Sequence, residues 1–110
     1  MDTETTQNET SAKIAKLNDR FRGMCLDVFY TKGVRDGIMD LIGLSRAVEC
    51  FSSFTEDNDP YGEHDFGSLR FEGQRIFWKI DYYDETLSKW CDPLDGRCRR
   101  HLTIMLAEEY

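Results

Sequence analysis

The strongest constraint on the fold is a run between Arg75 and Tyr83 in which every second residue is apolar. One face of this run is fully apolar and the other is mixed, and the apolar set is Ile76, Trp78, Ile80 and Tyr82. Residues 66–72 also alternate, and Gly73 supplies the positive φ that a tight hairpin turn needs. The pattern predicts a β-hairpin. Its second strand has aromatic residues on both faces, so we expect it to be central, with a helix covering one side.

The N-terminal part predicts a helix after a polar start. Residues 1–10 are rich in Thr, Glu and Asn, and we expect them to be disordered or frayed. Thr10 or Ser11 is a suitable N-cap for the helix that follows. Apolar residues at helical spacing predict its buried stripe as Ile14, Leu17 and Phe21.

A strand and a longer helix are predicted next. Residues 24–31 alternate as a strand, with Leu26 and Val28 facing inward. Asp36 is suited to cap a helix over residues 37–51, in which apolar residues recur every three or four positions.

The last segment, residues 101–110, fits two patterns. Leu102, Ile104 and Leu106 alternate as in a strand, whereas Leu102, Met105 and Leu106 fit a helix. The mixture of Thr and Ile favours a strand that pairs with the hairpin. These segments together predict a single α+β domain over residues 11–110, with a small antiparallel sheet of three to four strands and two helices packed on one face.

Charge and cysteine usage narrow the class of protein. The 110 residues carry a formal net charge of −7, which disfavours direct binding to a nucleic-acid backbone. The N-terminus has no apolar signal segment and no apolar run is long enough for a membrane span, so we expect a cytoplasmic protein without disulfides. Cys50 is interpreted, with Cys25, as a small core residue. Cys91 and Cys98 flank a loop that could bring them together, but no standard metal-binding spacing is present, and we predict no cofactor.

The most distinctive loop lies between the second helix and the hairpin. Pro60 and two glycines exclude a regular helix or central strand from residues 58–67. The surrounding segment, residues 52–69, contains five acids and no Lys or Arg. His64 lies among these acids, which gives the loop both carboxylate and imidazole groups.

Three segments resemble a known family. They are NDPYGEHDFG at residues 58–67, FWKIDYYD at 77–84 and LTIMLAEEY at 102–110, preceded by IAKLND at 14–19. Over residues 11–110 the chain resembles domain-of-unknown-function family 3768. This resemblance implies a small bacterial protein of a kind often carried on plasmids and other mobile elements. It implies no activity, but small acidic proteins of mobile elements often interfere with host defence, and anti-CRISPR proteins are examples.

Two functions are compatible with the loop. The first is a stoichiometric inhibitor whose acidic surface occupies the basic groove of a nucleic-acid-targeting defence complex, with tyrosines as anchors. A second copy of the chain is a further candidate partner. In this reading the partner-binding residues are Asp57, Asp59, Tyr61, Glu63, His64, Asp65, Asp81, Tyr83 and Asp84.

The second function is a small metal-dependent hydrolase, with Asp59, Glu63, His64 and Asp65 as ligands or acid–base groups. Each feature also has a structural interpretation. The acids can form a solvated loop, and His64 can lock the turn to the hairpin through Asp81 or a backbone carbonyl. Asp81 can form an ion pair with Lys79 or Arg70 instead of acting as an acid. We therefore expect a binding protein and not an enzyme.

Overall fold

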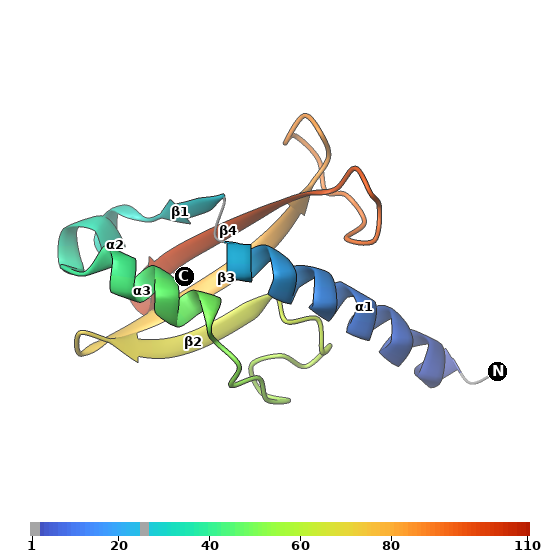
Figure 1. Ribbon diagram of the computed structural model, residues 1–110, viewed down its shortest axis with the longest axis horizontal. Helices are drawn as coiled ribbons and strands as arrows, with labels where there is room; N and C mark the ends of the chain where they lie inside the picture. Colours follow the sequence, from blue (N-terminus) through green and yellow to red (C-terminus); the bar gives the residue numbers. More distant parts are fainter. Residues whose placement is uncertain (1–2, 25–26) are drawn as a thin grey trace.

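The computed structural model describes residues 3–24 and 27–110 and has an α+β fold with a four-stranded sheet (Figure 1). The predicted class is confirmed. The described residues form three α-helices and not the predicted two, and these lie on one face of the sheet, whose strand order is β1-β4-β3-β2. Cys25, and Leu26 with its predicted inward orientation, lie outside the described residues. The elements are α1 (Thr3–Met24), β1 (Val28–Tyr30), α2 (Lys32–Gly37), α3 (Leu41–Glu49), β2 (Phe66–Phe71), β3 (Gln74–Tyr83), β4 (Arg99–Leu106) and the 3₁₀ helix η1 (Ala107–Glu109).

The sheet is mixed and not wholly antiparallel. β3 is central and pairs antiparallel with both β2 and β4, which confirms the predicted hairpin and the strand interpretation of the last segment. The hairpin turn has positive φ at Glu72 (51°) and Gly73 (76°). β1 adds the parallel pairing, with Val28 opposite Leu102. Because β1 has only three residues and its partner is distant in sequence, local patterns carried no information on its direction.

The helix predicted over residues 37–51 is shorter than expected, because only α3, at residues 41–49, falls within it, and a separate helix, α2, precedes it. Thr31 caps α2, with its Oγ1 accepting the Val34 N–H at 3.4 Å. Ile38 then takes extended backbone angles (φ −111°, ψ 124°), which ends α2. Asp40 caps α3 through the Gly43 N–H at 2.9 Å. Asp36, the predicted cap, instead lies 2.6 Å from the Lys32 ammonium.

A distant carboxylate stabilises the break between α2 and α3. The two carboxylate oxygens of Glu72, in the hairpin turn, accept the N–H groups of Met39 and Asp40, each at 2.9 Å. The free N–H groups at the start of a helix need partners of this kind. The break therefore depends on a residue that no local pattern links to this segment.

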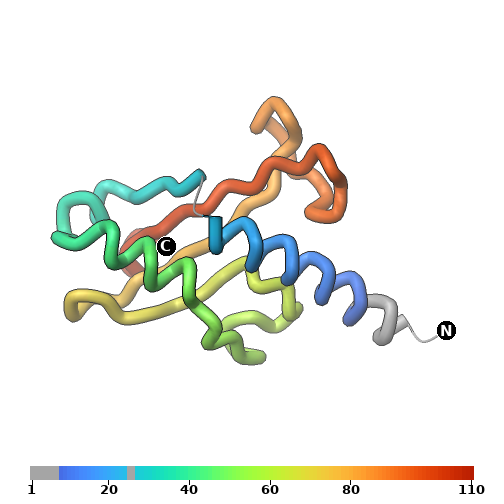
Figure 2. Tube along the Cα trace, in the orientation of Figure 1, coloured from blue at the N-terminus to red at the C-terminus, as the bar shows by residue number. Residues whose placement is uncertain are grey.

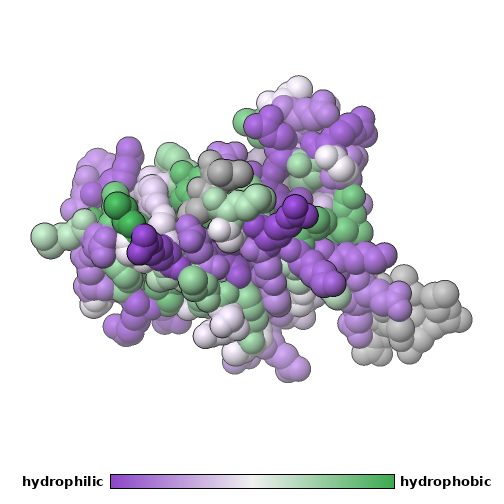
Figure 3. Space-filling view, in the orientation of Figure 1, coloured by the Kyte–Doolittle hydropathy of each residue, from purple (hydrophilic) through white to green (hydrophobic). Residues whose placement is uncertain are grey.

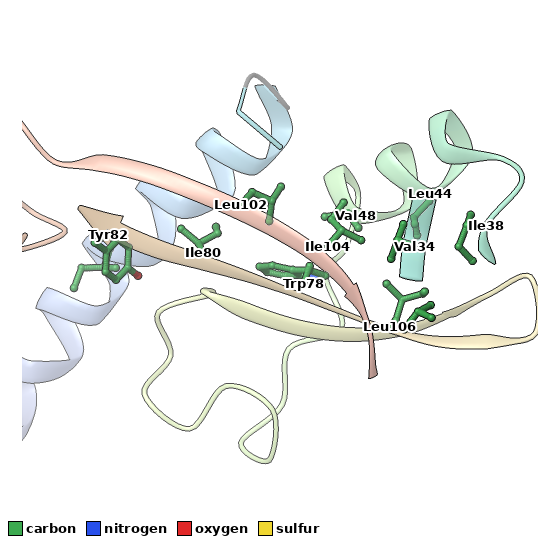
Figure 4. Packing of buried hydrophobic residues seen from close by; sticks show 12 residues of the cluster. Val34, Ile38, Leu44, Val48, Trp78, Ile80, Tyr82, Leu102, Ile104 and Leu106 are labelled. Atoms are coloured by element: carbon green, nitrogen blue, oxygen red, sulfur yellow. The ribbon is translucent and has the colours of Figure 1, made fainter. Parts of the chain in front are cut away.

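The core lies between the sheet and the helices (Figure 4). The predicted inward face of β3 is confirmed, and Trp78 at its centre is fully buried. The predicted stripe of α1 is partly wrong, because Leu17 is 41% exposed. The helix also begins at Thr3, well before the predicted cap. Its buried residues are Ile14, Ala15, Asn18 and Arg22.

We expect Gly67→Ala to destabilise the domain by about 1–3 kcal/mol, the usual range for overpacking a core. Gly67 is opposite Trp78 in the β2–β3 register, and an added Cβ would lie 2.4 Å from the indole Nε1. Urea unfolding measures the change. Gly96→Ala is the control, because no atom lies within 4 Å of its added Cβ. Equal stability of the two variants would show that the indole does not pack on β2 in this way.

Candidate partner-binding loop

Residues 52–65, here called the acidic loop, connect α3 to β2 and pass beside α1 (Figures 1 and 2). The side of the molecule that carries the helices is largely hydrophilic, with apolar patches between the polar side chains (Figure 3). Two side chains of the loop, Asp59 and His64, and three side chains of α1, Asn18, Asp19 and Arg22, hold the loop in place.

Asp59 anchors the loop from within. It is only 8% exposed, and its Oδ1 accepts the N–H groups of Glu63 at 3.1 Å and His64 at 3.2 Å. Its own N–H donates to the Thr55 carbonyl at 2.8 Å. The prediction that Asp59 lies on a contact surface is therefore wrong. A short polar side chain that accepts nearby backbone N–H groups is the usual way such turns are closed.

His64 joins the loop to α1. Its Nδ1 lies 2.9 Å from Oδ1 of Asp19, and its ring stacks on Phe54 with centroids 3.8 Å apart and planes 2° from parallel. Its Nε2 lies 3.7 Å from Asp59 Oδ2. The predicted partners, Asp81 and a backbone carbonyl, were wrong. His64 has a structural role, but it ties the loop to a helix and not to the hairpin.

Asn18 on α1 also holds the acidic loop, from the buried side of the helix. It is fully buried, and its Nδ2 donates to the Glu63 carbonyl at 3.0 Å and to Tyr82 Oη at 2.8 Å. Its Oδ1 accepts from Arg100 Nε at 2.6 Å. Burial raises the pKa of Tyr82 far above its usual value, so the phenol stays neutral at physiological pH. One amide therefore connects α1, the acidic loop, β3 and β4.

Arg22, one turn further along α1, fixes the start of the loop. It is 3% exposed, and it donates through Nε to the Val48 carbonyl at 2.9 Å and through Nη2 to the Phe51 carbonyl at 2.8 Å. Its guanidinium lies 4.7 Å from the centre of the Trp78 ring. These carbonyls belong to the end of α3 and the residues just after it, where a helix leaves acceptors without intrahelical partners.

The outer side of the fixed loop is acidic. Glu56 and Asp57 are exposed, and Tyr61 at the tip is 78% exposed. Tyr61, Asp65 and Asp81 line one hollow beside β3. Of the predicted surface residues, the structure thus brings Tyr61, Asp65 and Asp81 together.

The half-buried carboxylates repel one another. Burial raises the pKa of Glu63, and the charges of Asp65 and Asp59 raise it further. Burial is also the main cause that raises the pKa of Asp65, with Asp59 and Asp81 adding to it. Asp81 lies 3.3 Å from the Lys79 ammonium, which confirms one of its predicted partners.

Tyr83 and Asp84 do not join the loop. Tyr83 faces the helix-free side of the sheet beside His101. Asp84 accepts N–H groups of Thr86 at 3.0 Å and Ser88 at 3.1 Å, and the Thr86 hydroxyl is the main cause that lowers its pKa. Asp84 therefore closes its own turn.

Glu63→Gln should raise thermal stability at pH 7. A carboxyl whose pKa is raised by folding favours the fold below its unfolded pKa, and this contribution is lost as pH rises through the folded pKa. At neutral pH the ionised Glu63 therefore opposes folding, and an amide removes that effect. Thermal unfolding at pH 7 and pH 4 checks this, since the gain should shrink at pH 4. A loss of stability at pH 7 would contradict it.

The proposed metal ligands are engaged elsewhere. Asp59 accepts backbone N–H groups and His64 faces Asp19. Within residues 3–24 and 27–110, no group of three His, Cys, Asp or Glu side chains is arranged to hold a metal ion. Cys91 and Cys98 are both free thiols, and Cys50 is exposed, so its predicted place in the core is wrong.

Comparison with known proteins identifies the family. Residues 30–109 match the family described as "Protein of unknown function (DUF3768)". The chain belongs to this family. The DUF3768 match covers the acidic loop, the hairpin and β4, whereas α1 lies before it, with Asn18, Asp19 and Arg22. No curated protein and no solved structure matched the chain significantly.

No helix within the described ranges is long and apolar enough to cross a membrane.

Among the residues that hold the loop, sequence reasoning had missed Asn18, Asp19, Arg22 and Arg100. The spacing of Ile14, Asn18 and Arg22, four residues apart, was the available signal, because it places two polar side chains on the buried side of α1.

Proposed function

We propose that this DUF3768 protein binds and blocks another protein through its acidic loop. The partner would present a Lys/Arg-rich surface, such as the groove of a nucleic-acid-targeting defence complex in the cytoplasm of a bacterial host. The observation that carries the proposal is an exposed tyrosine between acids, Tyr61, on a loop that is anchored from inside the fold.

The anchoring of the acidic loop supports a binding role because it removes part of the entropic cost of association. A loop that is already ordered loses little conformational freedom when a partner docks. Asp59, Asn18 and His64 hold the chain from within and from α1, while Glu56 and Asp57 stay outside. The parts that hold the loop are thus separate from the parts that would touch a partner.

Electrostatics supports a cationic partner. Burial and then the charges of Asp65 and Asp59 raise the pKa of Glu63, and no Lys or Arg occurs between residues 52 and 69. A partner's Lys or Arg side chains would offset this repulsion, and complementary charge also speeds the encounter. Tyr61 would supply the aromatic anchor that binding hot spots favour. Such a surface would occupy the groove in place of phosphates, as expected for an anti-CRISPR-like inhibitor carried by a mobile element.

The test is a capture experiment with charge-reversed protein. Tagged wild type, Glu56→Lys/Asp57→Lys and Tyr61→Ala are incubated with host lysate, and the retained proteins are identified. Wild type should retain a nucleic-acid-binding complex and inhibit its nuclease activity. Both loop variants should retain at least about tenfold less of it.

Glu9→Lys/Glu85→Lys is the matched control. Both residues are exposed and lie outside the loop, and the pair changes the net charge by the same amount. The control should bind and inhibit like wild type. Equal capture by wild type and the Glu56→Lys/Asp57→Lys variant, with both folded, would refute the acidic-loop proposal.

A further inference from the structure

One face of the sheet, here called the open face, carries none of the described α-helices, because α1, α2 and α3 all pack on the other (Figures 1 and 4). The strand residues on this face are mainly basic, in contrast to the acidic protein as a whole. Strand alternation and register place Arg70, Arg75, Lys79 and Arg99 on it. Asp81 is the one acid that the strands place there, and it is paired with Lys79 at 3.3 Å.

Two arginines face each other at the hairpin end of the open face. Arg70 and Arg75 are directly opposite in the β2–β3 register, an arrangement that destabilises a sheet when the charges are alike. Arg75 lies over the Phe77 ring at 5.6 Å and donates to Ser68 Oγ at 3.3 Å. In the described part of the chain, neither arginine has an ion pair within 4.0 Å, although Glu108 lines the same hollow as Arg75. An anion between the two guanidinium groups would relieve their repulsion, and phosphate matches their fork geometry.

Planar side chains cross the other end of the face. Phe29 on β1 lies 6.2 Å from His101 on β4, which lies 6.5 Å from Tyr83 on β3. Tyr83 also pairs through its backbone with Trp90 in an antiparallel bridge, so the two side chains leave the backbone on the same side. Phe29 is 48% exposed and Trp90 is 70% exposed. Arg99 is opposite Tyr83, so a cation accompanies this row.

A second aromatic group lies nearer the hairpin. The rings of Phe66 and Phe77 are 5.2 Å apart, and Tyr110 contacts both at 5.7 and 5.5 Å. Tyr110 is 76% exposed. The open face thus presents aromatic rings at both ends, each beside arginine, over a strand of about 26 Å between Arg75 and Tyr83.

We propose that the open face binds single-stranded nucleic acid, with bases stacked on the aromatic rings and phosphates held by the arginines. Rings that stack bases beside cations that follow the backbone are the shared features of such sites. An acidic peptide would satisfy the arginines, but it has no planar groups to match the rings. The net charge of −7 had argued against nucleic acid, but it averages over the whole surface, and salt screens charges beyond about 10 Å at 0.1 M.

This inference goes beyond the proposed function and uses other residues. The acidic loop touches the open face at one corner, where Asp65 and Asp81 line a hollow with Phe66 and Tyr110. Binding at the open face is tested with purified protein and needs no host partner. Either idea can therefore fail without the other.

Fluorescence anisotropy with labelled 20-nucleotide oligo-dT and oligo-U tests the inference, at salt concentrations from about 50 to 200 mM. Wild type should bind with a Kd between about 1 and 100 µM, the range of non-specific binding. Arg70→Gln/Arg75→Gln should bind at least about tenfold more weakly. Its plot of log K against log salt should be shallower by about 1.4, the value for two lost phosphate contacts on a single strand.

Lys13→Gln/Lys16→Gln is the charge-matched control, because both lysines are exposed on α1 and both double variants change the net charge from −7 to −9. It should bind like wild type. Trp90→Ala should weaken binding about tenfold, as loss of a stacked base does. Circular dichroism confirms folding of each variant.

Tryptophan fluorescence gives an independent signal. Trp78 is buried and Trp90 is exposed, so a base stacked on Trp90 should quench the emission of wild type but not of Trp90→Ala. Three outcomes would overturn the inference. The first is no binding of either oligonucleotide at 50 mM salt, and the second is an equal loss of affinity in the arginine and lysine variants. The third is competition by poly-glutamate as strong as that by oligonucleotide, together with no effect of Trp90→Ala on binding. This third outcome would indicate an acidic protein as the occupant.

Discussion

Arg22→Met should destabilise the domain by about 4 kcal/mol, a large share of the 5–15 kcal/mol that holds a domain of this size together. Methionine can replace the aliphatic part of Arg22 over Trp78 but donates no hydrogen bonds. The carbonyls of Val48 and Phe51 would both lose the hydrogen bond from Arg22, although Val48 keeps the Phe51 N–H at 3.2 Å, and each such loss costs about 1–3 kcal/mol. Urea unfolding followed by circular dichroism measures the effect.

Arg20→Met is the control for this variant. Arg20 is exposed on the same helix, so the same substitution there should change stability by less than about 0.5 kcal/mol. If Arg22→Met is as stable as Arg20→Met, the contacts between α1 and the end of α3 do not hold the start of the acidic loop.

Asn18→Leu is expected to have the next largest effect, about 3 kcal/mol. Leucine has a similar volume but leaves Tyr82 Oη, Arg100 Nε and the Glu63 carbonyl without this partner, all near a buried site. The loss should be visible in the urea midpoint. Limited proteolysis should also cut the acidic loop faster, because one of its anchors on α1 is gone.

Asn8→Leu provides the matched control, since Asn8 is exposed near the start of α1. It should leave both the midpoint and the cleavage rate close to those of wild type. A destabilised Asn18→Leu variant whose loop resists protease like wild type would show that Asn18 supports the core without ordering the loop.

The hairpin and its neighbours were predictable because local chemistry and long-range packing agree there. Gly73 supplies the turn, and Ile76, Trp78 and Ile80 keep the alternation that burial requires. Where local chemistry and long-range packing disagree, the prediction of secondary structure failed. The break between α2 and α3 depends on Glu72, a residue far away in sequence, which satisfies N–H groups that a continuous helix would have used.

The sequence predicted which segment forms the candidate site, but not which side chains hold that segment in place. Composition located the acidic loop and Tyr61, because acids without nearby bases are visible in any window of sequence. Composition could not show that Asp59 points inward, because the sequence does not distinguish an aspartate that closes a turn from one that faces solvent. Asn18 and Arg22 were hidden for a related reason, because polar residues on a buried helix stripe are rare.

The acidic loop is ordered before any partner binds, because the fold itself anchors it. The N–H groups of Glu63 and His64 both donate to the Asp59 carboxylate, at 3.1 and 3.2 Å. Amide hydrogen exchange measured by NMR on the free protein tests this order at these two sites. We predict exchange at least about 100-fold slower than in an unstructured peptide, and faster exchange at both sites in Asp59→Ala. Exchange of both amides at the rate of an unstructured peptide in folded wild type would show that the free loop is not ordered.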